Sequence, residues 1–164
     1  MPNHVIHRLY IHGDNEQEVK SFIRGKAAID FDKIIPMPEE LEDTPAPTPM
    51  ETEDDINKHH ELMQKWGASN WYAWRLSNWD TKWNAYDIEE TEHYIQFQTA
   101  WSTPLKVIET LSLLFPENTF DVSFADEDLG YNCGSYMYQN GERISEEQGD
   151  MAWACELWGY ELES

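Results

Sequence analysis

The expected secondary-structure elements follow the order βαββαβ along the chain. This order predicts an α+β protein with a ferredoxin-like antiparallel sheet and helices on one face. Three observations predict this class. Apolar and polar residues alternate in four separate segments, as they do in half-buried strands. Two segments with helical apolar spacing lie after the first and third of these strands. A length of 164 residues suits one domain, here residues 1–164, with a substantial core.

The first strand and helix are predicted from residues 5–26. The alternation in VIHRLYIH predicts a strand over residues 5–12, which Gly13 would end. Asp14, with Gln17 at capping-box spacing, would begin a helix that continues to about Lys26. The apolar stripe of this helix would consist of Val19, Phe22 and Ile23.

Residues 29–80 are predicted to form an insert after this helix. Pro36 and Pro38 indicate that residues 29–38 are extended rather than helical, and residues 42–52 have the composition of an exposed, proline-rich linker. Helices are predicted over 54–66 and 70–79. The first would have an apolar stripe containing Ile56, His59 or His60, Met63 and Trp66. The second is apolar around most of its circumference, so we expect its tryptophans to clamp the insert onto the sheet.

The rest of the core is predicted over residues 81–128. Residues 81–89 and 93–101 would form a hairpin whose second strand buries Ile95, Phe97, Thr99 and Trp101. Thr103 and Pro104 signal the start of a helix, Pro116 ends it, and the alternation over 120–125 predicts the last core strand. With residues 1–28, this segment completes the ferredoxin-like pattern.

Residues 129–164 are predicted as a C-terminal extension. Asn140-Gly141 lies between two segments with strand character, which is a strong hairpin signal. Residues 148–160 would form a short amphipathic helix that carries Trp153 and Trp158.

The charge of the chain is strongly negative and unevenly distributed. Thirty-two acidic residues against eleven Lys and Arg give a formal net charge of -21. Residues 39–55 contain no base, and residues 107–164 contain Arg143 alone. This balance argues against nucleic acid as a direct ligand and against anionic membrane surfaces, and it favours a basic protein as partner. Because self-repulsion costs stability, such a charge calls for a reason.

Three segments together resemble a known family. They are FDKIIPMPEEL (31–41), NWDTKWNAYD (78–87) and FQTAWSTPLKVIETLSLLFP (97–116). Their order is similar to that in the YubB-type family of phage and plasmid proteins. The resemblance covers about residues 1–128 and implies a ferredoxin-like domain and a mobile-element origin. It implies no catalytic residues, since the family is largely uncharacterised. In this sequence Asp80 stands where the resemblance leads us to expect Gly.

No pattern in the sequence predicts a cofactor, a metal or a catalytic site. His7 would lie on the opposite face of the first strand from His4 and His12, and the chain lacks His and Cys at zinc spacing. Cys133 and Cys155 are expected to be reduced thiols, in keeping with a cytoplasmic protein of a bacterial host. The turn after the last core strand lacks calcium-loop spacing. With so many acids, paired carboxylates for an enzyme carry no specificity.

The function predicted from charge and resemblance is that of a non-enzymatic interaction protein. It would inhibit a host nucleic-acid-binding defence complex by presenting an acidic surface that mimics DNA. The predicted contact residues are seven acids and two aromatic anchors: Asp126, Glu127, Asp128, Glu142, Glu146, Glu147, Asp150, Trp153 and Trp158. The alternatives are an accessory phage protein whose acidity only keeps it soluble, and an enzyme with an unrecognised carboxylate site. Trp83 and Trp101 are expected to be structural.

Overall fold

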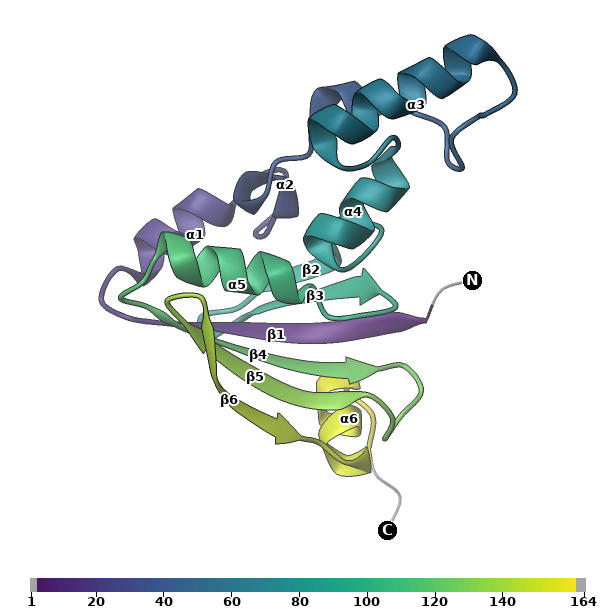
Figure 1. Ribbon diagram of the computed structural model, residues 1–164. Helices are drawn as coiled ribbons and strands as arrows, with labels where there is room; N and C mark the ends of the chain where they lie inside the picture. The colour runs from purple at the N-terminus through teal and green to yellow at the C-terminus, as the bar shows by residue number, and fades with distance from the viewer. Residues whose placement is uncertain (1–2, 162–164) are drawn as a thin grey trace.

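A six-stranded antiparallel sheet organises the computed structural model, which describes residues 3–161 (Figure 1). The strand order is β2-β3-β1-β4-β5-β6. The strands are β1 (His4–His12), β2 (Tyr86–Glu90), β3 (Ile95–Ala100), β4 (Thr119–Asp126), β5 (Cys133–Gln139) and β6 (Glu142–Gln148). With α1 (Glu16–Ile23) and α5 (Leu105–Leu114), the first four strands have the connectivity and order of a ferredoxin-like sheet. The predicted fold class is confirmed.

The two faces of the sheet are covered differently. On one face, Leu9 and Ile11 of β1 pack in the main core with residues of α1, α5 and the insert. On the other face, Ile6 packs with Ala154 and Leu157 of α6 (Met151–Trp158). This division follows the alternation along β1, because odd and even residues of a strand point to opposite faces. The C-terminal hairpin, β5 and β6, thus extends the same sheet, and α6 packs on the face opposite α1 and α5.

The insert contains α2 (Phe31–Ile34), the 3-10 helix η1 (Glu39–Leu41), α3 (Glu53–Trp66) and α4 (Trp71–Trp79). The prediction that residues 29–38 are extended is wrong over α2. Asp30 caps this single turn by accepting a hydrogen bond from the Asp32 amide at 3.0 Å, and the turn ends before Pro36. The predicted helices correspond to α3 and α4, with Gly67 ending α3 in the left-handed conformation.

Two tryptophans of α4 join the insert to the core, as predicted. Trp79 is 1% exposed, packs edge-on against Phe31 and Trp74, and donates its indole N–H to the Ile35 carbonyl at 2.9 Å. Trp74 is also buried. Because Phe31 in turn contacts Phe97 of β3, the aromatic chain runs from the insert into the sheet.

The helix α3 lies away from the sheet, at the top of Figure 1. Of its apolar residues only Leu62 is buried, whereas the predicted stripe faces water through Ile56, Met63 and Trp66. Hydroxyl contacts hold the segment after α3 in place, since Ser69 lies 2.7 Å from both His59 and Thr48. The apolar stripe of this helix is therefore not part of the core.

Several element boundaries differ from the prediction, among them those of α6, which is Met151–Trp158 because Gln148 still belongs to β6. Asn15, not Asp14, precedes α1, makes no side-chain cap, and the helix ends at Ile23. The strand β2 begins at Tyr86 and not at residue 81. Thr81 is not paired in the sheet; its buried hydroxyl donates to the Ala100 carbonyl at 2.7 Å. The strand β3 ends at Ala100, because Trp101 adopts a left-handed φ of 71° that breaks the alternation. The predicted Asn140-Gly141 hairpin is present, with φ values of 49° and 79°.

Candidate functional site

Most of the predicted contact residues gather at one end of the sheet, where β1 and β5 begin and β4 and β6 end. This end lies on the right of Figure 1. Glu127 and Asp128 follow β4, Glu146 and Glu147 are near the end of β6, and Asp150 precedes α6. All five are exposed. We call these residues the acidic end.

Two of the predicted acids do not belong to the exposed surface of the acidic end. Asp126 is only 3% exposed, because its carboxylate turns inward and accepts hydrogen bonds from the Asn3 side chain and the Asp128 amide. It therefore shapes the turn and contributes no outward charge. Glu142 begins β6, beside the hairpin turn, and so lies at the opposite end of the sheet from Glu146 and Glu147.

The acidic end contains a hollow of about 410 Å³. Its lining includes the aromatic residues Phe124 and Tyr136, polar Asn132, and the segment from Glu146 to Gly149. The Phe124 and Tyr136 rings are stacked with centroids 5.1 Å apart. The Arg143 guanidinium lies 4.3 Å from the Tyr136 centroid and 3.2 Å from the Glu146 carboxylate. The chain thus already places one guanidinium on an aromatic ring beside a carboxylate.

The predicted aromatic anchors are half-buried and occupied by internal contacts. The Trp153 indole N–H donates to the Phe124 carbonyl at 3.3 Å, and the Trp158 indole N–H donates to the Ala125 and Asp126 carbonyls at 3.1 Å. Both indoles pack beside the smaller core cluster under α6. Asp150 caps this helix by accepting from the Trp153 amide at 3.0 Å. The two indoles hold α6 against the sheet, and Asp150 stabilises the start of the helix.

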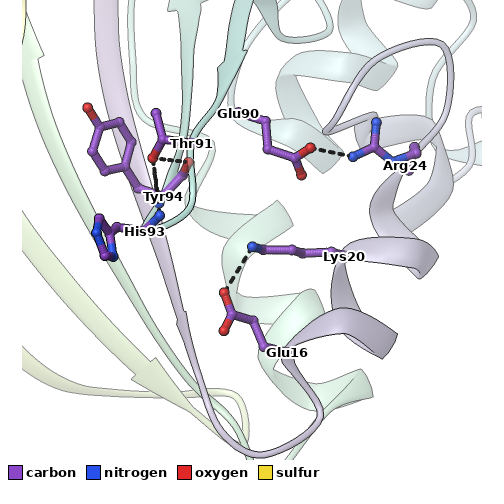
Figure 2. Close-up of polar contacts among 7 residues, drawn as sticks. All are labelled: Glu16, Lys20, Arg24, Glu90, Thr91, His93 and Tyr94. Carbon is purple, nitrogen blue, oxygen red and sulfur yellow. Dashed lines mark hydrogen bonds and ion pairs between the residues drawn. The ribbon is translucent and has the colours of Figure 1, made fainter.

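Most acids remain without a basic neighbour. Among residues 3–161 four ion pairs form, and Figure 2 shows the two that involve α1 or the residue directly after it. There Lys20 binds Glu16 at 2.9 Å, and Arg24 binds Glu90, at the end of β2, at 2.6 Å. Figure 2 also shows the adjacent turn, in which the Thr91 hydroxyl bonds to Tyr94. At the acidic end only the exposed Arg143–Glu146 pair forms among the described residues, so its negative field is largely uncompensated.

Burial shifts the pKa of three ionisable side chains that are not among the exposed acids of the acidic end. His7 is completely buried, stacks on Phe97 with ring centroids 4.8 Å apart, and bonds to the Thr103 hydroxyl through Nε2. Burial lowers the pKa of His7 to about 3. Burial likewise raises the pKa of the Asp121 carboxyl and of the Cys133 thiol. Ser69 has a histidine partner in His59, but its hydroxyl is buried and serves to fix the insert.

Residues 3–161 contain neither a metal-binding cluster nor a membrane-spanning helix. No group of three or more His, Cys, Asp and Glu side chains is arranged to hold a metal ion. In the same part of the chain, no helix combines the length and the apolar character needed to cross a bilayer.

Sequence reasoning missed one cluster of aromatic residues. Trp83 and Trp101, expected to be structural, are 38% and 41% exposed. Lys82 lies between them, with its Nζ 4.3 Å from each ring centroid. The signal in the sequence was the clustering of Trp83 and Tyr86 at the start of β2, outside the expected helix.

The fold and its acidic end define an acidic α+β protein with a ferredoxin-like sheet. Residues 78–163 match the family model described as the ferredoxin-like domain in Api92-like protein, and the chain belongs to this family. The matched segment includes the C-terminal hairpin and α6. Among solved structures, the crystal structure of protein Api92 from Yersinia pseudotuberculosis is similar, with 14% sequence identity and a TM-score of 0.46. The alignment covers 73% of this chain and 39% of that protein. No curated protein matches.

Proposed function

We propose that this chain is an acidic interaction protein that occupies the nucleic-acid-binding surface of a basic protein. The observation that carries the proposal is the acidic end itself. Glu127, Asp128, Glu146 and Glu147 lie exposed at one end of a rigid sheet, where Arg143 is the one base paired with them among the described residues. The formal net charge of -21 supports the same reading.

The mechanism is competition through charge. A nucleic-acid-binding surface is built from Lys and Arg, which attract phosphates by a field that salt screens. Carboxylates on a folded domain present a negative field similar to that of the phosphates of a nucleic acid. Electrostatic steering would speed association, and the partner would then be unable to bind nucleic acid.

The partner we propose is a nucleic-acid-binding defence complex in the cytoplasm of a bacterial host. The support is the resemblance of three motifs to YubB-type proteins, which favours a phage or plasmid origin. A gene carried by a mobile element benefits when such a complex is blocked.

The test is capture of partners from a bacterial lysate at low and at moderate salt. The wild-type chain should capture a basic nucleic-acid-binding protein, and capture should fall steeply as salt rises. The variant Glu127→Lys, Glu146→Lys, Glu147→Lys should abolish capture. Asp150 is spared because it caps α6, and its loss would cost about 1 kcal/mol of helix stability.

A matched control comes from the other end of the sheet. Asp14→Lys, Glu117→Lys, Glu142→Lys makes the same change in net charge on exposed acids. If this control also abolishes capture, binding depends on overall charge and not on the acidic end.

One observation favours a second function for the acidity. Both edge strands carry exposed acids, Asp87, Glu89 and Glu90 on β2 and Glu142, Glu146 and Glu147 on β6. Charged residues on edge strands prevent sheets from pairing with one another. On this alternative the Lys variant at the acidic end would capture the same proteins as the wild type and stay soluble, because Lys also blocks edge pairing. A Glu146→Val, Glu147→Val variant would instead aggregate.

A further inference from the structure

The corner formed by the loop before β2, the end of β3 and the start of β1 displays aromatic side chains that the core does not use. Trp83 and Trp101 keep large parts of their indoles in water. Tyr72 and Tyr86 extend the cluster, since the first lies edge-on to Trp101 and the second edge-on to Trp83. Exposed aromatic clusters of this kind are typical of interaction sites.

The backbone holds Trp101 outward. Alternation from Thr99 would turn the side chain of residue 101 into the core, but the φ of 71° at Trp101 prevents this. A left-handed conformation is unfavourable for a bulky residue, and it persists because surrounding contacts determine it. The Trp101 amide donates to the Asn3 carbonyl at 2.8 Å, and the Thr99 hydroxyl donates to the Ser102 carbonyl at 2.6 Å. The fold thus maintains an unfavourable backbone in order to expose an indole.

This corner already binds a cation within the chain. The Lys82 Nζ lies 4.3 Å from the centroids of both Trp83 and Trp101, well within the range of cation–π attraction. Aromatic faces that hold one ammonium group can hold a cation from another molecule.

A hollow of about 500 Å³ lies beside the lysine, lined by His4, Trp83, Asn84, Tyr86 and Asp87. None of these described lining residues is Lys or Arg. Asp87 provides a carboxylate at the wall, and Glu127 of the acidic end is close enough to act on the Tyr86 hydroxyl. Burial, followed by these two carboxylates, raises the pKa of Tyr86 to about 12. The hollow is therefore aromatic, has Asp87 in its lining and adjoins the acidic end, because the Glu127 amide donates to the carbonyl of His4, a lining residue, at 2.9 Å.

We propose that this hollow binds an arginine side chain of the basic partner, with the guanidinium stacked on Trp83 or Tyr86 and paired with Asp87. A planar guanidinium suits such a site better than an ammonium, because it stacks on aromatic rings and forms bidentate hydrogen bonds with carboxylates. Arg143 makes the same combination inside this chain, on Tyr136 and Glu146. The identity of the partner as a basic protein rests on the proposed function; the site and its guanidinium ligand do not.

The test uses the full chain and a short capped peptide of alternating Gly and Arg, in 0.15 M salt. A peptide with citrulline in place of Arg is the control, since citrulline has nearly the same shape but no charge. The indole N–H resonance of Trp83 should shift with the arginine peptide and not with the citrulline peptide. Equal shifts with both peptides, or no shift with either, would overturn the proposal. A shift caused instead by a neutral oligosaccharide would assign the hollow to sugars.

Three variants give the test its specificity. Binding to the variants is measured by isothermal titration calorimetry, because Trp83→Leu lacks the Trp83 resonance. Trp83→Leu should weaken binding of the arginine peptide at least about fivefold, because it removes the aromatic ring and keeps an apolar side chain. Trp66→Leu is the control: Trp66 on α3 is equally exposed, at 38%, and has Lys65 5.6 Å from its ring. It should change binding less than about twofold. Asp87→Asn should also weaken binding, since Asn tolerates the φ of 49° at this position and lacks the charge. Equal losses with Trp66→Leu and Trp83→Leu would contradict the assignment.

The two proposals can fail separately. If the arginine peptide binds at Trp83 but no nucleic-acid-binding protein is captured, the arginine site stands and the proposed function fails. If capture depends on Glu127, Glu146 and Glu147 while the peptide leaves Trp83 unchanged, the arginine site alone is wrong.

Discussion

Acidification from pH 7 to pH 5 should destabilise the fold through His7. This side chain is buried, and its Nδ1 has no hydrogen-bond partner among the described residues, so the imidazolium would be poorly accommodated. The pKa of His7 is about 3 in the folded chain, whereas an unfolded histidine has a pKa of about 6.5. Because the unfolded chain binds the proton more readily, the stability contribution is present above pH 6.5 and is lost as the pH falls toward 3. Linkage gives a loss of about 2 kcal/mol between pH 7 and pH 5.

The assay is urea unfolding at both pH values for the wild type and for His7→Phe, which keeps a ring that can stack on Phe97. Carboxylates also titrate in this range, so the informative quantity is the difference between the two proteins. The wild type should lose about 2 kcal/mol more than His7→Phe. His12→Phe, at an exposed position, should behave like the wild type. Equal losses in the wild type and in His7→Phe would refute the assignment of a neutral, buried His7.

Three further substitutions test the packing described above by urea unfolding. Trp79→Ala should cost about 3–5 kcal/mol, because it empties a buried site and leaves the Ile35 carbonyl without its donor, whereas a cost below about 1 kcal/mol would mean that the insert is not clamped. Gly134→Ala should cost at least about 1–3 kcal/mol, since the added Cβ would lie 2.1 Å from the Glu147 carbonyl oxygen; a neutral effect would contradict the close approach of β5 and β6. Asp80→Ala should cost more than Asp80→Gly, because Asp80 has a left-handed φ of 63° and also accepts a hydrogen bond from the Lys106 amide at 2.8 Å. Equal costs would show that only the hydrogen bond matters.

The order of strands and helices could be predicted because local patterns determine it. Alternation along β1, β3 and β4 is regular, and the end of α3 is marked by Gly67. The sheet order could be proposed because the βαββαβ connectivity favours few arrangements. The ferredoxin-like domain that the resemblance implied is confirmed, but by the family model of Api92-like proteins. This model matches residues 78–163 and so extends beyond residues 1–128, from which the resemblance was drawn.

The positions of the tryptophans could not be predicted from periodicity. Trp101 would be buried by alternation, but one left-handed residue ends the strand and exposes it. Trp153 and Trp158 appeared available in an acidic region, yet backbone carbonyls at the end of β4 bind both indole N–H groups. Both errors concern contacts between residues distant in sequence.

The predicted acids show the same limit. Glu127 and Asp128 lie at the same end of the sheet as Glu146 and Glu147 only because antiparallel pairing places the start of β5 between the end of β4 and the end of β6. Asp126, their neighbour in sequence, turns inward because Asn3 and the Asp128 amide offer hydrogen bonds. Composition predicts that the chain is acidic, and the topology determines which acids share a surface.

The central claim is that the acidic end occupies the surface at which a basic partner binds nucleic acid. Its most direct test is fluorescence anisotropy of a labelled DNA duplex bound to the captured partner, titrated with this chain. We expect the wild type to displace the duplex and the Glu127→Lys, Glu146→Lys, Glu147→Lys variant to leave it bound. Salt should weaken the binding of the partner both to the duplex and to the wild-type chain. A ternary complex, in which the partner holds the duplex and this chain at the same time, would contradict the claim.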